Sequence, residues 1–186
     1  LLSIVSHFQL QGTVQEINPL GAGLINDTYK VSTLEADAPD YVLQRINHAI
    51  FQNVEMLQAN INAVTTHIRK KLEEKGEKDI ERKVLHFFPA DTGKTYWHDG
   101  ESYWRVMAFI PNARTYETVN SEYSYYAGVA FGNFQAMLAD IPDKLGETIP
   151  DFHNMEFRLK QLRDAVAADA VGRVKEVRYF VDEIER

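Results

Sequence analysis

Glycines followed by a cation are the residues in this sequence whose types and spacing best suit a chemical role. Gly21, Gly23 and Asn26 lie in a turn between two strand-like stretches, and Arg45 lies on the next strand along the chain. Glycine can adopt a positive φ and bring backbone N–H groups close to a ligand. A glycine turn beside a fixed cation therefore suits a polyphosphate, and an ordinary hairpin turn without a ligand is the alternative.

The sequence around this turn resembles a known family. Residues 21–29 read Gly-Ala-Gly-Leu-Ile-Asn-Asp-Thr-Tyr, and residues 41–47 read Tyr-Val-Leu-Gln-Arg-Ile-Asn. Together they resemble the amino-terminal lobe of aminoglycoside phosphotransferase-like small-molecule kinases, most closely the N-acetylhexosamine 1-kinase branch. The resemblance runs through nearly all 186 residues. It implies transfer of the γ-phosphate of ATP, with Mg²⁺, to a hydroxyl of a small-molecule acceptor, with a hexosamine or other amino sugar expected.

The resemblance also implies which residues would hold the phosphates. Gly21, Gly23 and Asn26 would form the loop over them, with Asn26 in the place of the third glycine of protein kinases. Arg45 would be the strand cation, although it matches a position where lysine is usual. Glu55, in the first turn of the next helix, would orient Arg45. The alternatives are a surface arginine at a strand end and an acidic residue that only favours the helix dipole.

The resemblance places the adenine ring farther along the sheet. Leu43 shares a strand face with Arg45 and would cover the ring from above. The end of a strongly apolar strand would supply the hinge that contacts the ring through its backbone. These hinge residues are Met107, Ala108, Phe109 and Ile110.

The catalytic segment of the family has no counterpart in this sequence. It should contain His-x-Asp with an Asn shortly beyond it, followed later by a metal-binding Asp. His98-Asp99 precedes the expected hinge, and Asp151-Phe152-His153 has no catalytic loop before it. We therefore expect the amino-terminal portion of such an enzyme, without catalytic residues or metal ligands and inactive alone. The alternatives are a nucleotide-binding pseudokinase module and a structural or interaction domain without a ligand.

The elements that would position these residues predict an α+β fold with a kinase-like small lobe. Strand-like stretches occur at residues 13–17, 28–33, 41–46, 83–89, 95–98 and 102–110, and we expect an antiparallel sheet of about five strands. Asn53 is a good N-cap for one long helix over residues 54–74. Pro111 breaks the last strand, so we expect a small lobe at residues 1–110 and the helical start of a large lobe at 111–186.

The second part of the chain is expected to be helical. A broad apolar stripe after Ser121 predicts a well-buried helix. Its members are Tyr123, Tyr126, Ala127, Ala130, Phe131, Phe134, Met137 and Leu138. Residues 155–168 and 171–184 predict two further helices, and the apolar face around Val174, Val177 and Val181 makes self-association a reasonable expectation.

Composition narrows the possible partners. The net charge of -7 argues against a broad nucleic-acid or anionic-membrane surface. The sequence has no cysteine, which excludes disulfides and thiolate zinc sites and is compatible with the cytoplasm. The histidines show no paired ligand spacing, and no apolar run approaches the length of a membrane span.

Overall fold

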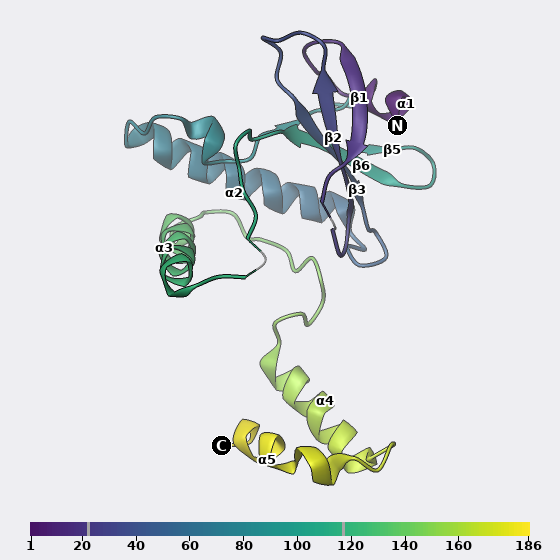
Figure 1. The fold of residues 1–186 in the computed structure, drawn as a ribbon, viewed down its shortest axis with the longest axis vertical. Coiled ribbons are helices and arrows are strands. Elements are labelled where there is room, and N and C mark those ends of the chain that lie inside the picture. Colours follow the sequence, from purple (N-terminus) through teal and green to yellow (C-terminus); the bar gives the residue numbers. More distant parts are fainter. Residues whose placement is uncertain (22, 117) are drawn as a thin grey trace. The chain divides into compact units, whose positions relative to one another are not determined.

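The computed structural model describes residues 1–21, 23–116 and 118–186 (Figure 1). Contacts along the chain divide it into two compact units, Leu1–Thr148 and Ile149–Arg186. The boundary expected after residue 110 lies inside the first unit, and the division into kinase lobes stays a prediction.

The first unit is built on an antiparallel sheet that has six strands in the described residues. The strands are β1 (Val14–Pro19), β2 (Asp27–Thr33), β3 (Tyr41–Ile46), β4 (Phe87–Phe88), β5 (Trp97–His98) and β6 (Tyr103–Ala108). They are ordered β1-β2-β3-β6-β4, and β5 also pairs with β6. The antiparallel sheet and the helices confirm the α+β class.

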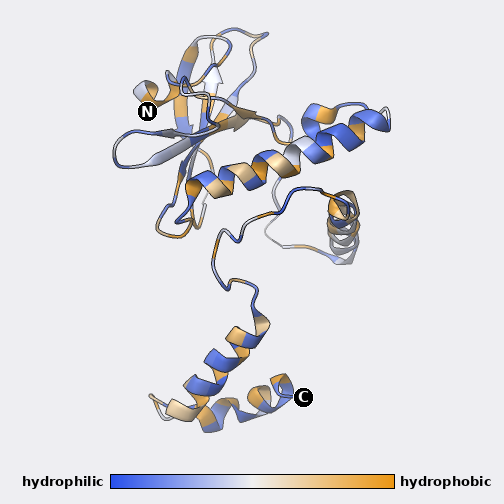
Figure 2. Ribbon diagram, turned by 180° about the vertical axis from the view of Figure 1, so that it is seen from behind, coloured by the Kyte–Doolittle hydropathy of each residue, from blue (hydrophilic) through white to orange (hydrophobic). Residues whose placement is uncertain are grey.

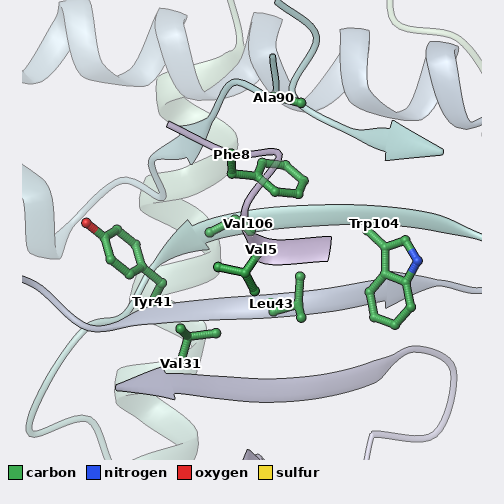
Figure 3. Packing of buried hydrophobic residues seen from close by; sticks show 8 residues of the cluster. All are labelled: Val5, Phe8, Val31, Tyr41, Leu43, Ala90, Trp104 and Val106. Carbon is green, nitrogen blue, oxygen red and sulfur yellow. The ribbon is translucent and has the colours of Figure 1, made fainter. Parts of the chain in front are cut away.

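One face of this sheet is sealed by the amino-terminal segment (Figure 3). Helix α1 (Leu2–Val5) and the residues after it place Val5 and Phe8 in one cluster with Tyr41 and Leu43. The hydroxyl of Tyr41 accepts a hydrogen bond from the N–H of Gln11 at 2.8 Å and donates one to its carbonyl at 3.0 Å. The segment is therefore held to the sheet by apolar packing and by a satisfied polar group.

Helix α2 (Val54–Glu74) packs against the other face of the sheet. It has the predicted bounds, and the Asn53 side chain accepts the predicted capping bond from the N–H of Met56 at 2.9 Å. Val54 and Leu57 pack against Ile46 of β3. The carboxyl-terminal half packs against the segment that contains the short 3₁₀ helix η1 (Ile80–Arg82).

Helix α3 (Ser121–Leu138), coloured by the hydropathy of its residues in Figure 2, is not the well-buried helix that the apolar stripe predicts. None of residues 121–138, all of which the structure describes, is buried, and Phe131 is 70% exposed. Only its last turn, with Met137 and Leu138, packs against the cluster formed by the end of α2. The stripe correctly predicts a helix, but most of its side chains have no described element packed over them.

The second unit consists of helices α4 (Met155–Ala168) and α5 (Val174–Ile184). Arg163 of α4 donates through Nε to Glu185 at 2.7 Å, and this bond holds the pKa of the Glu185 carboxyl below its usual value. Helix α5 begins later than predicted, since Gly172 has a φ of 69° and the Asp169 side chain accepts from the N–H of Val174. Val181 is buried, and self-association stays a prediction.

Candidate functional site

The glycine turn joins β1 to β2 as the sequence predicts. The N–H of Leu20 donates to the carbonyl of Thr28 at 2.8 Å and closes the hairpin. Gly21 has a φ of 71°, which favours glycine. A Cβ atom built on Gly23 would lie 2.5 Å from the carbonyl oxygen of Asn26, so even alanine requires the backbone to move there.

Asn26 fixes this turn to the end of strand β3. Its side-chain oxygen accepts a hydrogen bond from the N–H of Asn47 at 2.9 Å. The Asn47 side chain in turn accepts from the N–H of Ala49 at 3.1 Å. Two turns that are distant in the sequence are therefore held side by side, and Asn26 has a structural role at this junction.

A small cavity lies beside this junction and includes Arg45. It has a volume of about 270 Å³ and is lined by Ile25, Asp27, Arg45, Ile46, Asn47, His48, Ala49 and Ser102. Of the predicted phosphate-site residues, Arg45 lines this cavity and Asn26 is bonded to the lining residue Asn47, whereas Gly21 and Gly23 are not among the lining residues. The residues that line the cavity include a guanidinium, a carboxylate and a histidine ring, those of Arg45, Asp27 and His48.

Asp27 already neutralises part of the charge of Arg45. The two residues are directly opposed across β2 and β3, and Nε of Arg45 donates to the Asp27 carboxylate at 2.7 Å. Both side chains are about half exposed, and the guanidinium makes a second contact with the same carboxylate oxygen. An anion that binds Arg45 would have to compete with this carboxylate.

The predicted pairing of Glu55 with Arg45 is not formed. Glu55 accepts instead from the amino group of Lys94 at 3.0 Å, and Lys94 also donates to the hydroxyl of Tyr96 at 3.1 Å. These bonds to Tyr96 and Glu55 raise the pKa of the Lys94 amino group. The physical reason is position, because Asp27 lies opposite Arg45 on the neighbouring strand and supplies its carboxylate.

Leu43 lies where a bound ring could not reach it. Its exposed fraction is 0%, and it packs in the cluster that the amino-terminal segment covers (Figure 3). Arg45 lies two residues farther along β3 and alternation places it on this same side. The shared face predicted for Leu43 and Arg45 is therefore present, but over Leu43 it is occupied by protein.

The expected hinge already uses part of its backbone. The N–H of Ala108 donates to the carbonyl of His86 at 2.9 Å, and the N–H of Phe109 donates to the carbonyl of Asp40 at 3.1 Å. Met107 is buried in β6. Two N–H donors of Met107–Ile110 are thus engaged within the protein, and adenine binding by this segment stays a prediction.

A polar network on the face toward α2 was not expected from the sequence. Nε and one terminal nitrogen of Arg105 donate to the side-chain oxygen of Gln44 at 2.9 and 2.6 Å. The other terminal nitrogen donates to the side-chain oxygen of Gln58 on α2 at 3.0 Å. Gln44 then donates to the hydroxyl of Thr28 at 2.9 Å, and Gln58 donates to the carbonyl of Thr95 at 2.7 Å.

A signal for this network was present in the sequence. Arg105 interrupts an otherwise apolar strand, and Gln44 lies on the face of β3 opposite to Leu43 and Arg45. Burial lowers the pKa of the Arg105 guanidinium to about 10, which still leaves it protonated at neutral pH. Its position opposite Gln44 depends on the pairing register of β3 with β6, which the sequence pattern does not specify.

Three further observations, on membrane-spanning helices, metal-binding groups and known protein families, assign no function to this site. Among residues 1–21, 23–116 and 118–186, no helix has the length and apolar character needed to cross a bilayer. The same residues hold no group of three or more His, Cys, Asp or Glu side chains that could bind a metal ion. No protein-family description matches the chain.

Proposed function

We propose that this chain is the nucleotide-binding portion of a phosphotransferase that moves the γ-phosphate of ATP to a hydroxyl of a small molecule. An amino sugar such as a hexosamine is the expected acceptor, and the cytoplasm is the expected compartment. The observation that most supports the proposal is the glycine turn held against the end of β3 by Asn26, with a cavity and an arginine beside it. The order of elements, a sheet with one long helix after its third strand, agrees with a kinase-like small lobe.

In phosphoryl transfer a protein mainly positions the reacting groups and stabilises their charge. This portion of the enzyme would position the phosphates of ATP and stabilise their charge. We expect the backbone N–H groups of the turn to contact phosphate oxygens, and the turn itself requires glycine, because a Cβ on Gly23 would lie 2.5 Å from the carbonyl oxygen of Asn26. Arg45 lies on β3, the strand next to β2, and Arg105 lies on β6, one strand farther along the sheet. The described residues do not offer a set of side-chain ligands for Mg²⁺, so no metal ligand is assigned to this chain.

Calorimetric titration with ATP tests the proposal directly. We expect the wild-type chain to bind ATP and Gly23→Ala to bind it about tenfold more weakly, since the new Cβ would displace the Asn26 carbonyl. Gly128→Ala is the matched control, because a Cβ there meets nothing within 4 Å. Absence of ATP binding to the wild-type chain, or equal affinities of the two variants, would contradict the proposal.

Catalysis is expected to be absent from the chain by itself. The sequence lacks the catalytic segment of the family that it resembles, so binding should occur without turnover. A coupled assay for ADP in the presence of N-acetylhexosamines measures this. Steady ADP release that depends on the sugar would show that the residues for phosphate transfer lie within this chain.

A further inference from the structure

Arg105 differs from three other arginines of the chain in the groups that hold it. Arg45 contacts Asp27, Arg69 contacts Glu81 and Arg163 contacts Glu185, and each of these partners is a carboxylate. Arg105 contacts the amide oxygens of Gln44 and Gln58, and no ion pair to Arg105 is present in the described part of the chain. The described residues therefore leave its positive charge uncompensated.

The surroundings of Arg105 raise the energetic cost of leaving its charge without a counter-charge. Gln58 is only 2% exposed, and the guanidinium lies over the ring of Phe87 at 5.5 Å. Charged groups in such places are usually paired, because removal from water is costly. Its three hydrogen bonds also leave N–H donors of the guanidinium unused. A phosphate oxygen would supply both the missing charge and the missing acceptor.

A chain of contacts connects Arg105 to the glycine turn. A Cβ built on Gly23 would lie 3.8 Å from the hydroxyl oxygen of Thr28, so the turn approaches β2 at this residue. That hydroxyl accepts from Gln44, and Gln44 accepts from Arg105. Thr28, Gln44 and Arg105 are direct neighbours across β2, β3 and β6. The turn thus lies beside Thr28, and Thr28 begins a row of hydrogen-bonded side chains on the face toward α2 that ends at the guanidinium.

We infer that Arg105, rather than Arg45, is the cation that binds the polyphosphate of the nucleotide, on the face of the sheet that α2 covers. This inference rests on the proposed function and names the phosphate ligand within it. Arg45 is the weaker candidate because Asp27 already occupies it. Gln44 and Gln58 hold the guanidinium in place while leaving its charge available, which a carboxylate at either position would not do.

Substitution of Gln58 by glutamate tests the assignment with almost no change in side-chain size. Gln58→Glu would place a carboxylate within 3.0 Å of Arg105, where the amide oxygen now lies. We expect the affinity for ATP and for inorganic tripolyphosphate to fall about tenfold or more, with an unchanged or higher melting temperature. Gln52→Glu adds the same charge at an exposed residue just before α2 and should leave both affinities within about twofold of wild type.

The outcomes separate this assignment from the proposed function. If Gly23→Ala weakens ATP binding while Gln58→Glu binds as wild type and Arg45→Gln does not bind, the site exists but Arg105 is not its cation. If the wild-type chain binds no ATP, the proposed function and the assignment both fall. If Gln58→Glu does not fold, Gln44→Glu decides the question in the same way, because its carboxylate would face the same guanidinium.

Discussion

The two faces of the sheet differ in the polarity of their side chains and in the partners of those side chains. The face with Tyr41 and Leu43 is apolar where the amino-terminal segment seals it, and polar atoms within it are satisfied: the Tyr41 hydroxyl bonds to Gln11, and the Trp104 indole N–H donates to Asp99. The face toward α2 carries Gln44 and Arg105, whose partners are neutral amides and a hydroxyl. The same strands supply both faces, because successive side chains of a strand point in opposite directions.

The difference between the two faces predicts different effects of substitutions on them. The cluster sealed by the amino-terminal segment contributes free energy of folding, and protein covers it where a ligand would have to bind. A face that holds a charge among neutral groups contributes less to stability and can recognise an anion. We therefore expect substitutions in the sealed cluster to have the largest effects on unfolding, and substitutions around Arg105 to change binding as well as stability.

The largest effect is expected from Leu43→Ala on the sealed face. Leu43 is fully buried, so the substitution should lower the free energy of unfolding by about 2–5 kcal/mol through lost burial and a residual cavity. Urea unfolding followed by circular dichroism measures it. Val42→Ala, on the partly exposed opposite side of β3, should cost less than half as much, and equal costs would break the distinction between the faces.

Arg105→Met should have the next largest effect on stability. The side-chain oxygens of Gln44 and Gln58 would lose their donors, which should cost about 1–3 kcal/mol in the same urea experiment. Arg45→Met removes an arginine whose ion pair with Asp27 is about half exposed, and should cost less than about 1 kcal/mol. A smaller loss at Arg105 than at Arg45 would argue that the network is not structural.

Asp40 should make a pH-dependent contribution on the polar face. Its ion pair with Lys30 at 2.8 Å, helped by the N–H of Thr33, holds the pKa of the Asp40 carboxyl below its usual value. A folded pKa below the unfolded one stabilises the protein above about pH 4, and this stability is lost as the pH falls through the folded pKa. Asp40→Asn should therefore destabilise by about 0.5–1.5 kcal/mol at pH 7 and by less at pH 3.

Thermal melts of wild type and Asp40→Asn between pH 7 and pH 3 measure this change. The same substitution at Asp37, in the exposed part of the loop between β2 and β3, serves as the control and should show a small difference at each pH. A difference for Asp40→Asn that grows toward low pH would contradict the assigned direction.

The smallest effect is expected from Phe131→Ser on α3. Phe131 is 70% exposed, so the free energy of unfolding should change by less than about 0.5 kcal/mol. Phe8→Ser, in the sealed cluster, is the matched control and should be strongly destabilising. A large loss at Phe131 would mean that α3 is covered in solution, as its apolar stripe predicts.

Local features of the fold could be predicted well. The bounds of α2, its cap at Asn53 and the glycine turn all follow from residues that are near one another in the chain. Asp99 accepts from the N–H groups of Glu101 and Ser102, as a tight turn requires. These features form without reference to the rest of the molecule, so their signals are complete in the sequence.

The partners of charged residues could not be predicted in the same way. Glu55 contacts Lys94 instead of Arg45, since Asp27 lies opposite Arg45 in the pairing register of β2 and β3. Arg105 meets Gln44 for the same reason in the register of β3 and β6. Many charges of either sign are available to each of these residues, and only the register decides which of them comes within reach.

The sequence by itself determined the α+β class, the glycine turn and the helices, because hydrophobic period and turn residues act over a few neighbouring positions. The tertiary structure alone decided which face of β3 is sealed, which arginine lacks a carboxylate and which helix stays exposed. These depend on where the amino-terminal segment and α2 pack, and packing joins residues that no local pattern connects.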